Sequence, residues 1–150
     1  MNRNHGIGNA GEFYVLAQLA QRGYIAAKTD EGQTLIDVIA TDPETLNTVN
    51  IQVKTSQHAH ATWWMMSKKN EAHYDSLFYV LVKLNGTDQQ PSFFVFHSSD
   101  VGPWLKQDHA AWQAKPKRDG GQRVDGPLRK FRPTPEQLEA ARDNWEALFV

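Results

Sequence analysis

The 150-residue sequence contains no cysteine, and this absence excludes several kinds of chemistry at once. Disulfide bonds, thiolate zinc sites, iron–sulfur clusters and cysteine nucleophiles all need that side chain. A chain without cysteine fits a reducing compartment. No apolar run approaches the roughly 18 residues that a membrane-spanning helix needs, and the first residues lack the apolar stretch of a signal peptide. We therefore expect a cytoplasmic protein without membrane contact.

A strong net charge of either sign is also lacking, because 16 lysines and arginines are balanced by 17 aspartates and glutamates. The distribution is uneven, since residues 115–132 carry seven basic side chains against two acidic ones. That segment has a charge of +5, and the rest of the chain sums to −6. A basic stretch of this kind can face phosphates. Its other interpretation is a solvated loop.

Length and hydrophobic periodicity predict one domain, residues 1–150, of mixed α and β structure. Residues 48–55 alternate strictly, with Val49, Ile51 and Val53 on one face. A capping-box signature precedes the last expected helix. The expected elements are a helix at 10–22, strands at 24–28, 34–40, 48–55, 61–66, 77–84 and 92–97, a helix at 101–112, a basic loop at 115–133 and a C-terminal helix at 134–149. We expect an α/β (α+β) fold with a central mixed β-sheet flanked by helices.

The hairpin expected over residues 34–55 brings together side chains that can act on a phosphodiester. Asp37 supplies a carboxylate, while Gln52 and Lys54 point to one face of a strand with Cα atoms about 6.6 Å apart. Carboxylate and amide oxygens suit Mg²⁺. Lys54 can activate water or neutralise a developing oxyanion. Taken alone, the spacing also fits an amphipathic surface hairpin with its polar residues in water.

The residues before the hairpin extend this pattern. Glu12 lies in the first expected helix, so that Glu12, Asp37, Gln52 and Lys54 fall on a helix and then on two successive strands. Over residues 6–84 this order resembles the PD-(D/E)XK nuclease superfamily, in particular Holliday-junction resolvases and related small bacterial proteins. Those proteins carry a helix glutamate, an aspartate and then Glu/Gln-x-Lys. The resemblance implies a restriction-endonuclease-like fold and hydrolysis of nucleic-acid phosphodiesters.

The resemblance also implies roles for individual residues. Asp37, Gln52, Lys54 and Glu12 would be catalytic. A divalent cation, Mg²⁺ or Mn²⁺, would be held by Asp37, Gln52, Glu12 and the carbonyl of Val53, while Lys54 would act on the attacking water. Gln52 stands in place of an acid and removes one negative charge from the cation's ligands. We therefore expect weak cation binding.

Two functions stay open at this point. The first is a metal-dependent endonuclease, with DNA as the expected nucleic acid. The second is a catalytically inactive module of the same fold that binds nucleic acid or a protein partner. Gln52 and the neutral net charge favour the second, whereas Asp37, Lys54 and Glu12 favour the first. Glu12 has its own alternative, because its spacing from Asn9 is that of a helix capping box. Superfamily members that cut both strands often act as dimers, so the resemblance is compatible with a homodimer.

Basic side chains outside the hairpin are the candidate phosphate contacts. If the protein binds nucleic acid, the basic segment should flank the same cleft as Asp37. The candidates are Lys68, Lys69, Lys117, Arg118, Arg123, Arg129 and Lys130. A third class, a hydrolase that uses His97 as its base, lacks the sequence pattern of a nucleophile elbow.

Overall fold

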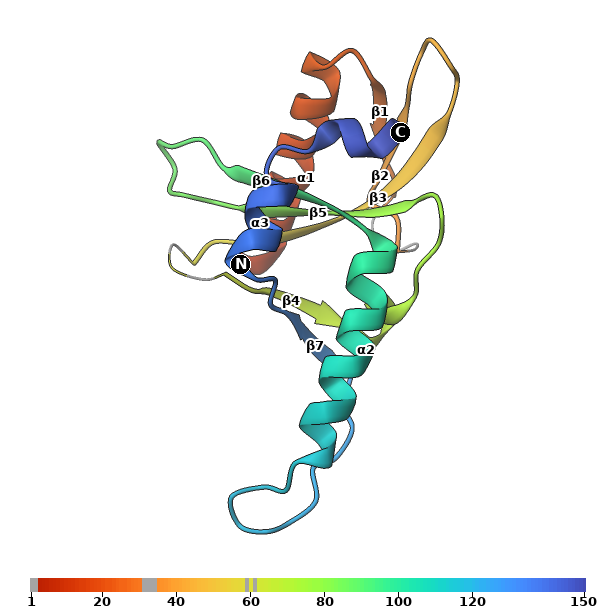
Figure 1. The fold of residues 1–150 in the computed structure, drawn as a ribbon. Helices are drawn as coiled ribbons and strands as arrows, with labels where there is room; N and C mark the ends of the chain where they lie inside the picture. Colours follow the sequence, from red (N-terminus) through yellow and green to blue (C-terminus); the bar gives the residue numbers. More distant parts are fainter. Residues whose placement is uncertain (1–2, 31–34, 59, 61) are drawn as a thin grey trace.

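The computed structural model describes residues 3–30, 35–58, 60 and 62–150 (Figure 1). Its elements are α1 (Arg3–Gln21), β1 (Ile25–Lys28), β2 (Val38–Thr41), β3 (Thr48–Ser56), β4 (Trp64–Ser67), η1 (Lys68–Glu71), β5 (Leu77–Lys83), β6 (Ser92–His97), α2 (Ser98–Ala114), β7 (Leu128–Phe131), α3 (Pro135–Ala141) and η2 (Trp145–Phe149). The strands expected at 34–40 and 61–66 begin later, at Val38 and Trp64. Residues 34 and 61, where those predictions started, lie outside the described residues.

Five strands form one mixed sheet in the order β1-β2-β3-β5-β6. Strands β3 and β5 are parallel, and the other neighbours are antiparallel. The valine- and phenylalanine-rich sequences of β5 and β6 suit strands that are buried on both faces. The mixed sheet and the β2–β3 hairpin expected from the sequence are confirmed.

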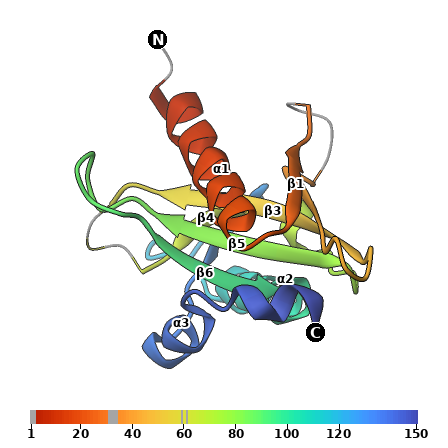
Figure 2. The ribbon, with the colours of Figure 1, turned by 90° about the horizontal axis from the view of Figure 1, so that it is seen from above.

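The alternation of side chains gives this sheet two apolar faces, which different elements cover. The first face packs against Val15 and Leu19 of α1 and against Trp145 of η2. The second face packs against α2, α3 and a separate two-stranded ribbon of β4 and β7, with Leu105 and Phe131 in its core. Helix α1 crosses one side of the sheet, while α2 and α3 lie on the other (Figure 2).

Two glycines allow close packing that any side chain would prevent. A Cβ atom on Gly11 of α1 would lie 1.9 Å from Oγ1 of Thr55, and one on Gly102 of α2 would lie 2.5 Å from the carbonyl oxygen of Glu71. Both distances are far below van der Waals contact. Gly11 therefore sets how closely α1 approaches β3, and Gly102 sets how closely α2 approaches η1.

The single C-terminal helix expected over 134–149 is wrong. The expected capping box is present at its start, but α3 ends at Ala141. Asp143 adopts a φ of 50°, and its N–H donates to the carbonyl of Phe93 in β6 at 2.9 Å. The chain thereby crosses the β6 edge, because Ala141 packs on the second face and Trp145 on the first.

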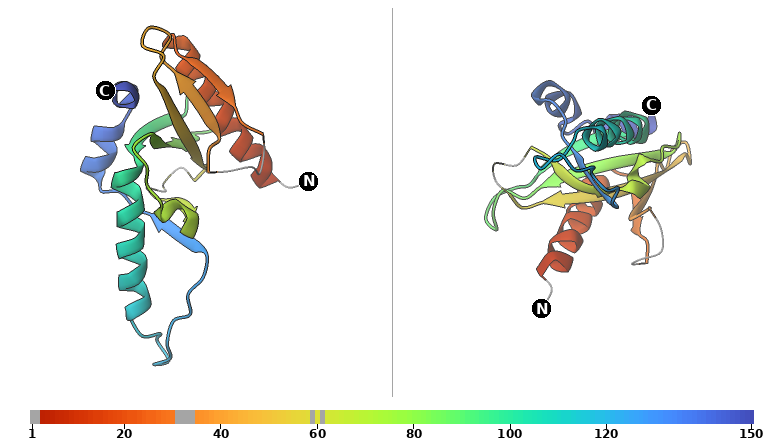
Figure 3. Two further views of the ribbon diagram at one scale, coloured as in Figure 1. Left: turned by 90° about the vertical axis from the view of Figure 1, so that its right-hand side faces the viewer. Right: turned by 90° about the horizontal axis from the view of Figure 1, so that it is seen from below.

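The basic loop expected at 115–133 is also shorter, since residues 128–131 form β7 and pair antiparallel with β4. Helix α2 extends beyond the five-stranded sheet, and residues 115–127 connect its far end to β7 (Figures 1 and 3). We call residues 105–132 together with β4 the arm. Among the residues that the structure describes, no helix is long and apolar enough to cross a membrane.

Candidate active site

Asp37 lies immediately before β2, where the backbone pairing of β2 with β3 stops. Its N–H donates to the carbonyl of Ile51 at 2.9 Å, and its carboxylate accepts the N–H of Val53 at 2.8 Å. The side chain therefore takes the place of a backbone carbonyl opposite β3. Because the N–H and C=O of one strand residue point to the same side, the Val53 carbonyl also faces the side on which Asp37 lies.

Burial raises the pKa of Asp37 and is the largest influence on this carboxyl group. The Val53 N–H opposes the rise, the negative charge of Glu12 adds to it, and the cations Lys54 and Lys28 oppose it. These interactions gather two carboxylates and two amines at the end of β2. A half-buried carboxylate beside a second carboxylate is an arrangement in which a cation would relieve repulsion.

Glu12 reaches this cluster from α1, next to the close contact that Gly11 makes with β3. Its carboxylate forms an ion pair with Lys28 of β1, and both side chains are largely buried. Since α1 begins at Arg3, Glu12 lies in the middle of the helix. The capping-box alternative is therefore wrong for Glu12.

Lys54 approaches the cluster from β3 and is half-buried. Burial lowers the pKa of its ammonium group, and the neighbouring Asp37 carboxylate opposes that effect. A lysine with a lowered pKa releases its proton more readily than an exposed one. The ammonium group of Lys54 therefore lies beside the Asp37 carboxylate and gives up its proton more readily than that of an exposed lysine.

Gln52 points, as predicted, to the face opposite Val49 and Ile51, but it enters a buried polar network rather than water. Its side chain is only 9% exposed. Its carbonyl oxygen accepts a hydrogen bond from the amide of Asn70, a fully buried residue of η1. Among the described residues, Gln52 shows no interaction with Asp37 in addition to this bond.

The oxygen donors around Asp37 decide which cation the site could hold. They are the carboxylates of Asp37 and Glu12 and the carbonyl of Val53. Within the described ranges there is no group of three or more His, Cys, Asp or Glu residues that could hold a metal ion. This small, all-oxygen set fits a hard divalent cation that keeps several of its water ligands, as Mg²⁺ does. It does not fit a zinc site.

Two residues near this cluster were missed by the sequence analysis. Lys28 ends the strand that was expected at 24–28. The sequence therefore predicted its secondary structure but not its ion pair with Glu12. Asn70 carries no local signal, because it lies in the polar segment that follows β4 and such segments are usually solvated. Only the three-dimensional structure shows that Asn70 is enclosed.

The expected phosphate contacts divide into exposed and buried side chains. Lys68, Lys69, Lys117, Arg118 and Lys130 are exposed.

Arg129 is 4% exposed, and its guanidinium donates to the carbonyls of Gly126 and Leu128 at 2.6 and 2.9 Å. It also lies 3.5 Å from the carboxylate of Glu71. The alternation of β7 turns Arg129 inward and Lys130 outward. Arg129 therefore supports the arm from inside, and it is removed from the expected phosphate contacts.

Two other cations of the arm lie against indole rings. Arg123 lies over Trp112, with 4.8 Å between the guanidinium carbon and the ring centre, and Lys130 lies over Trp63 at 4.7 Å. Residues 115–127 begin at the far end of α2 and run back to β7 (Figure 3). Asn70, which bonds to Gln52, lies in η1, directly after strand β4 of the arm. The basic loop itself therefore does not adjoin Asp37.

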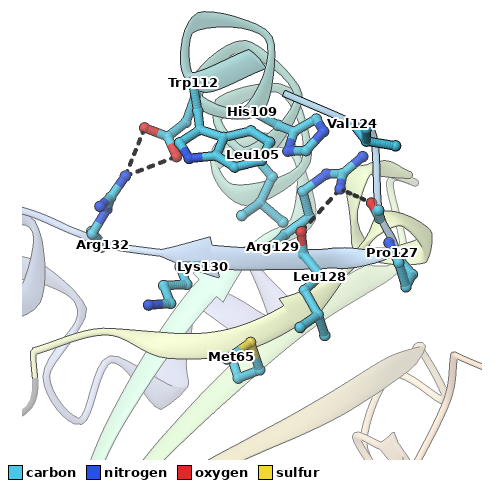
Figure 4. A pocket seen from close by; sticks show the side chains of 12 residues that line it. Met65, Leu105, His109, Trp112, Val124, Pro127, Leu128, Arg129, Lys130 and Arg132 are labelled. Atoms are coloured by element: carbon cyan, nitrogen blue, oxygen red, sulfur yellow. Dashed lines mark hydrogen bonds and ion pairs between the residues drawn. The ribbon is translucent and has the colours of Figure 1, made fainter. Parts of the chain in front are cut away.

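A pocket of about 460 Å³ lies within the arm, between α2 and β7 (Figure 4). Its apolar walls come from Met65, Leu105, Trp112, Val124 and Leu128. Its polar side chains pair with their neighbours, Arg132 with Asp108 at 3.0 Å and His109 with Asp125 at 2.7 Å. Asp37 is not among the lining residues, so this pocket is separate from the candidate active site.

His97, the base of the third function class, has both ring nitrogens engaged. Nδ1 accepts the N–H of Ser99 at 3.1 Å and caps α2, while Nε2 lies 3.0 Å from the carbonyl oxygen of Asp75. Nδ1 also lies 2.7 Å from the hydroxyl oxygen of Ser99. These contacts hold His97 at the N-terminal cap of α2, and the chain lacks a nucleophile-elbow pattern around these residues.

Comparison with known proteins finds a solved structure of similar fold. No family model and no curated protein matches the sequence. A solved structure of a bacterial homing endonuclease, I-Ssp6803I, matches with a TM-score of 0.56 over 95% of this chain and 88% of that chain. The fold is similar to that of a homing endonuclease. Because the two sequences are 11% identical, the likeness concerns the fold alone. It agrees with the mixed sheet flanked by helices that the sequence predicted.

Proposed function

We propose that this protein is a metal-dependent endonuclease that hydrolyses nucleic-acid phosphodiesters. The observation that carries the proposal is the cluster at the end of β2. There the Asp37 carboxylate is held by the Val53 N–H and interacts electrostatically with Glu12 and Lys54. The homing-endonuclease-like fold and the PD-(D/E)XK-like order of these residues support the same conclusion.

In this proposal Asp37, Glu12 and the Val53 carbonyl hold Mg²⁺ or Mn²⁺. When bound, such a cation polarises a phosphoryl oxygen and lowers the pKa of a bound water. The Val53 N–H fixes one oxygen of Asp37 and leaves the other for the site. Lys28 holds the Glu12 carboxylate in place. Lys54 accepts a proton from the attacking water or neutralises the charge that develops on the phosphate.

The exposed cations support nucleic acid as the partner, which we propose to be DNA. Lys117, Arg118 and Lys130 lie on the arm, and Lys68 and Lys69 lie near its base. Side chains of this kind bind the phosphate backbone without reading the sequence. Members of the PD-(D/E)XK superfamily that cut both strands often act as dimers, so the proposal extends to a homodimer.

A non-catalytic module that binds nucleic acid or a protein partner is the second candidate. It is favoured by the composition of the site, where two carboxylates are present and Gln52 stands in place of a third acid. The Gln52 oxygen is moreover bonded to Asn70. Fewer anionic ligands mean weaker attraction for a divalent cation. The two candidates differ in whether the nucleic acid is cleaved.

A cleavage assay distinguishes these candidates. Wild type, Lys54→Ala and a control, Lys83→Ala, are incubated with Mg²⁺ or Mn²⁺ and linear double-stranded, single-stranded or branched DNA. Lys83 is a half-buried lysine on the neighbouring strand β5, where it pairs with Ser56. We expect cleavage by wild type and by the control, and a loss of about 10²–10⁴-fold in Lys54→Ala. Binding without cleavage by all three proteins would favour the second candidate.

A further inference from the structure

Asn70 is a buried polar residue that belongs to none of the sequence motifs. It lies in η1 with an exposure of 0%. Its side chain is hydrogen-bonded to Ser67, Gln52 and Tyr79. Because a buried amide needs partners for both its oxygen and its NH₂ group, this network allows one orientation of the Asn70 amide.

The backbone decides that orientation. The N–H of Ser67, which can only donate, bonds to Oδ1 of Asn70 at 2.8 Å. The Asn70 NH₂ group must therefore point the other way, toward Gln52 and toward the hydroxyl of Tyr79 at 3.3 Å. The Tyr79 hydroxyl donates in turn to the backbone carbonyl of Asn70 at 3.3 Å. The oxygen of this hydroxyl can therefore accept a hydrogen bond from the Asn70 NH₂ group.

The orientation of Asn70 then decides that of Gln52. The atom of Gln52 that faces the Asn70 NH₂ group has to be an acceptor, so it is Oε1. The reverse arrangement would place two NH₂ groups against each other. In the part of the chain that the structure describes, the Gln52 NH₂ group has no hydrogen-bond partner. It is also not one of the fully buried polar atoms without a partner, so it is not completely enclosed. It lies on the strand face that also carries Lys54.

We propose that Asn70 is a positioning residue, which turns the oxygen of Gln52 into the protein and the NH₂ group of Gln52 toward the candidate active site. Gln52 then donates a hydrogen bond to an anionic oxygen, such as that of a substrate phosphate, and does not ligate the cation. The identity of that oxygen rests on the proposed nuclease function. This role replaces the metal-ligand role that the sequence suggested for Gln52.

The proposal gives a physical reason for glutamine at position 52. A glutamate would place a negative charge beside the phosphate and repel it, whereas an amide NH₂ group attracts a phosphate oxygen. A glutamate would also have no hydrogen to donate when it is ionised. Compared with a glutamate, the amide therefore lowers the affinity for the cation and raises the affinity for the anionic substrate.

Side-chain amide exchange, measured by ¹⁵N NMR on the full chain, detects these orientations directly. The Gln52 and Asn70 signals are assigned by their loss in Gln52→Met and Asn70→Asp. In wild type we expect the bonded Asn70 NH₂ group to exchange about tenfold or more slowly than the Gln52 NH₂ group. Equal exchange, or stronger protection of Gln52, would overturn the proposal without any variant beyond those used for assignment.

Asn70→Asp tests the positioning role itself. The new carboxylate can still accept the Ser67 N–H, but it cannot donate to Gln52. We expect the Gln52 amide to turn over and its NH₂ group to become protected by about tenfold. Unchanged exchange of the Gln52 NH₂ group in a folded Asn70→Asp protein would show that Asn70 does not set its orientation. If the variant does not fold, the wild-type comparison decides.

Mn²⁺ binding separates this inference from the proposed function. Gln52→Met keeps the length of the side chain and removes its oxygen. We expect calorimetric titration to give the same Mn²⁺ affinity as wild type within about twofold, whereas loss of a ligand would weaken it by about tenfold or more. The weaker result would overturn the inference. Absence of Mn²⁺ binding by wild type would contradict the metal-dependent function, and amide exchange would still decide the orientation of Gln52.

Discussion

Asp37 combines two tasks in one carboxylate. One task is structural, because the side chain accepts the Val53 N–H where β2 has no backbone to offer. The other follows from its surroundings, since Glu12, Lys28 and Lys54 all act on its charge. A residue in this position couples the end of the hairpin to the ionisation state of the site, and this coupling leads to two predictions about pH.

Cation affinity should depend on pH through Asp37. Burial raises the pKa of Asp37 above the 3.8 of an ordinary aspartate, so the carboxyl group keeps its proton to a higher pH. We expect the Mn²⁺ affinity of wild type to fall as the pH is lowered through that raised pKa. Asp37→Asn should bind Mn²⁺ no more tightly than wild type at any pH. Calorimetric titrations at a series of pH values measure this. An affinity that stays level down to the ordinary aspartate value would contradict the prediction.

The stability of the fold should respond to the same group. The raised pKa of Asp37 means that the folded chain holds this proton more tightly than the unfolded chain. The resulting stabilisation is fully present below the unfolded value and is lost as the pH rises through the folded pKa. Relative to Asp37→Asn, wild type should therefore gain stability on acidification. Thermal unfolding of both proteins across this range tests the sign, and a difference that is independent of pH would refute it.

Gln52→Glu should tighten Mn²⁺ binding. One carboxylate oxygen can still accept the Asn70 NH₂ group, while the second adds an anion close to the Asp37 cluster. We expect an increase of about tenfold by calorimetry, because one added unit charge near a divalent cation is worth more than 1 kcal/mol even at an effective dielectric constant of about 20. Gln107→Glu, an exposed change on α2, controls for net charge. Equal affinities would show that a charge at position 52 does not act on the cation site.

Among the elements, α1 and β3 are the pair on which the site depends most directly. Gly11 lets α1 lie against Thr55, and the next residue along the helix is Glu12. The helix thus serves as the support for one of the two carboxylates. Its distance from β3 is set by the missing side chain of a single residue.

Gly11→Ala should push α1 away from β3. The added Cβ would lie 1.9 Å from Oγ1 of Thr55, so we expect a loss of about 1–3 kcal/mol in the free energy of unfolding. Denaturant titration measures it. Gly8→Ala is the matched control on the same helix, since no atom lies within 4 Å of its Cβ position, and it should be neutral or stabilising. Thr55→Ala in the Gly11→Ala background should restore part of the loss.

Most of the strands could be predicted from the sequence because their apolar residues alternate, and Asp37 and Lys54 could be proposed as candidates because their order has a recognisable pattern. The C-terminal break could not be predicted. Leu138, Ala141 and Trp145 keep helical spacing, yet they pack on opposite faces of the sheet. Periodicity reports which residues are buried and not which face they cover. The burial of Asn70 could not be predicted for a related reason, because the enclosure of a polar turn depends on distant parts of the chain.

For the whole molecule, the arm separates much of the positive charge from the Asp37 cluster. Its exposed cations should contribute to affinity for nucleic acid and to the salt dependence of that affinity. Lys117→Ala and Arg118→Ala should each reduce the slope of log affinity against log salt by about one, with unchanged stability. Fluorescence anisotropy with a labelled duplex measures the slope. An unchanged slope in both variants would show that this loop is merely solvated.

Arg129 should behave in the opposite way. Its guanidinium is enclosed and bonded to two carbonyls of the arm, so Arg129→Met leaves those groups and Glu71 without their partner. We expect a loss of about 3–5 kcal/mol in the free energy of unfolding. Thermal and denaturant unfolding measure this effect independently of any nucleic acid. A stable Arg129→Met protein with a reduced salt slope would instead return Arg129 to the phosphate contacts.

The turn at the β6 edge has a consequence for the behaviour of many molecules together. Strand β6 contains the run Phe93-Phe94-Val95-Phe96, and an unpaired edge of that composition is a template for strand addition by another chain. Arg142 forms a bridge with Phe94 and lies over its ring, while Asp143 bonds to Phe93. The C-terminal segment therefore shields an aggregation-prone strand. Chains cut before Arg142 should form fibrillar or amorphous deposits at concentrations where the full chain stays dispersed, and light scattering would show the difference.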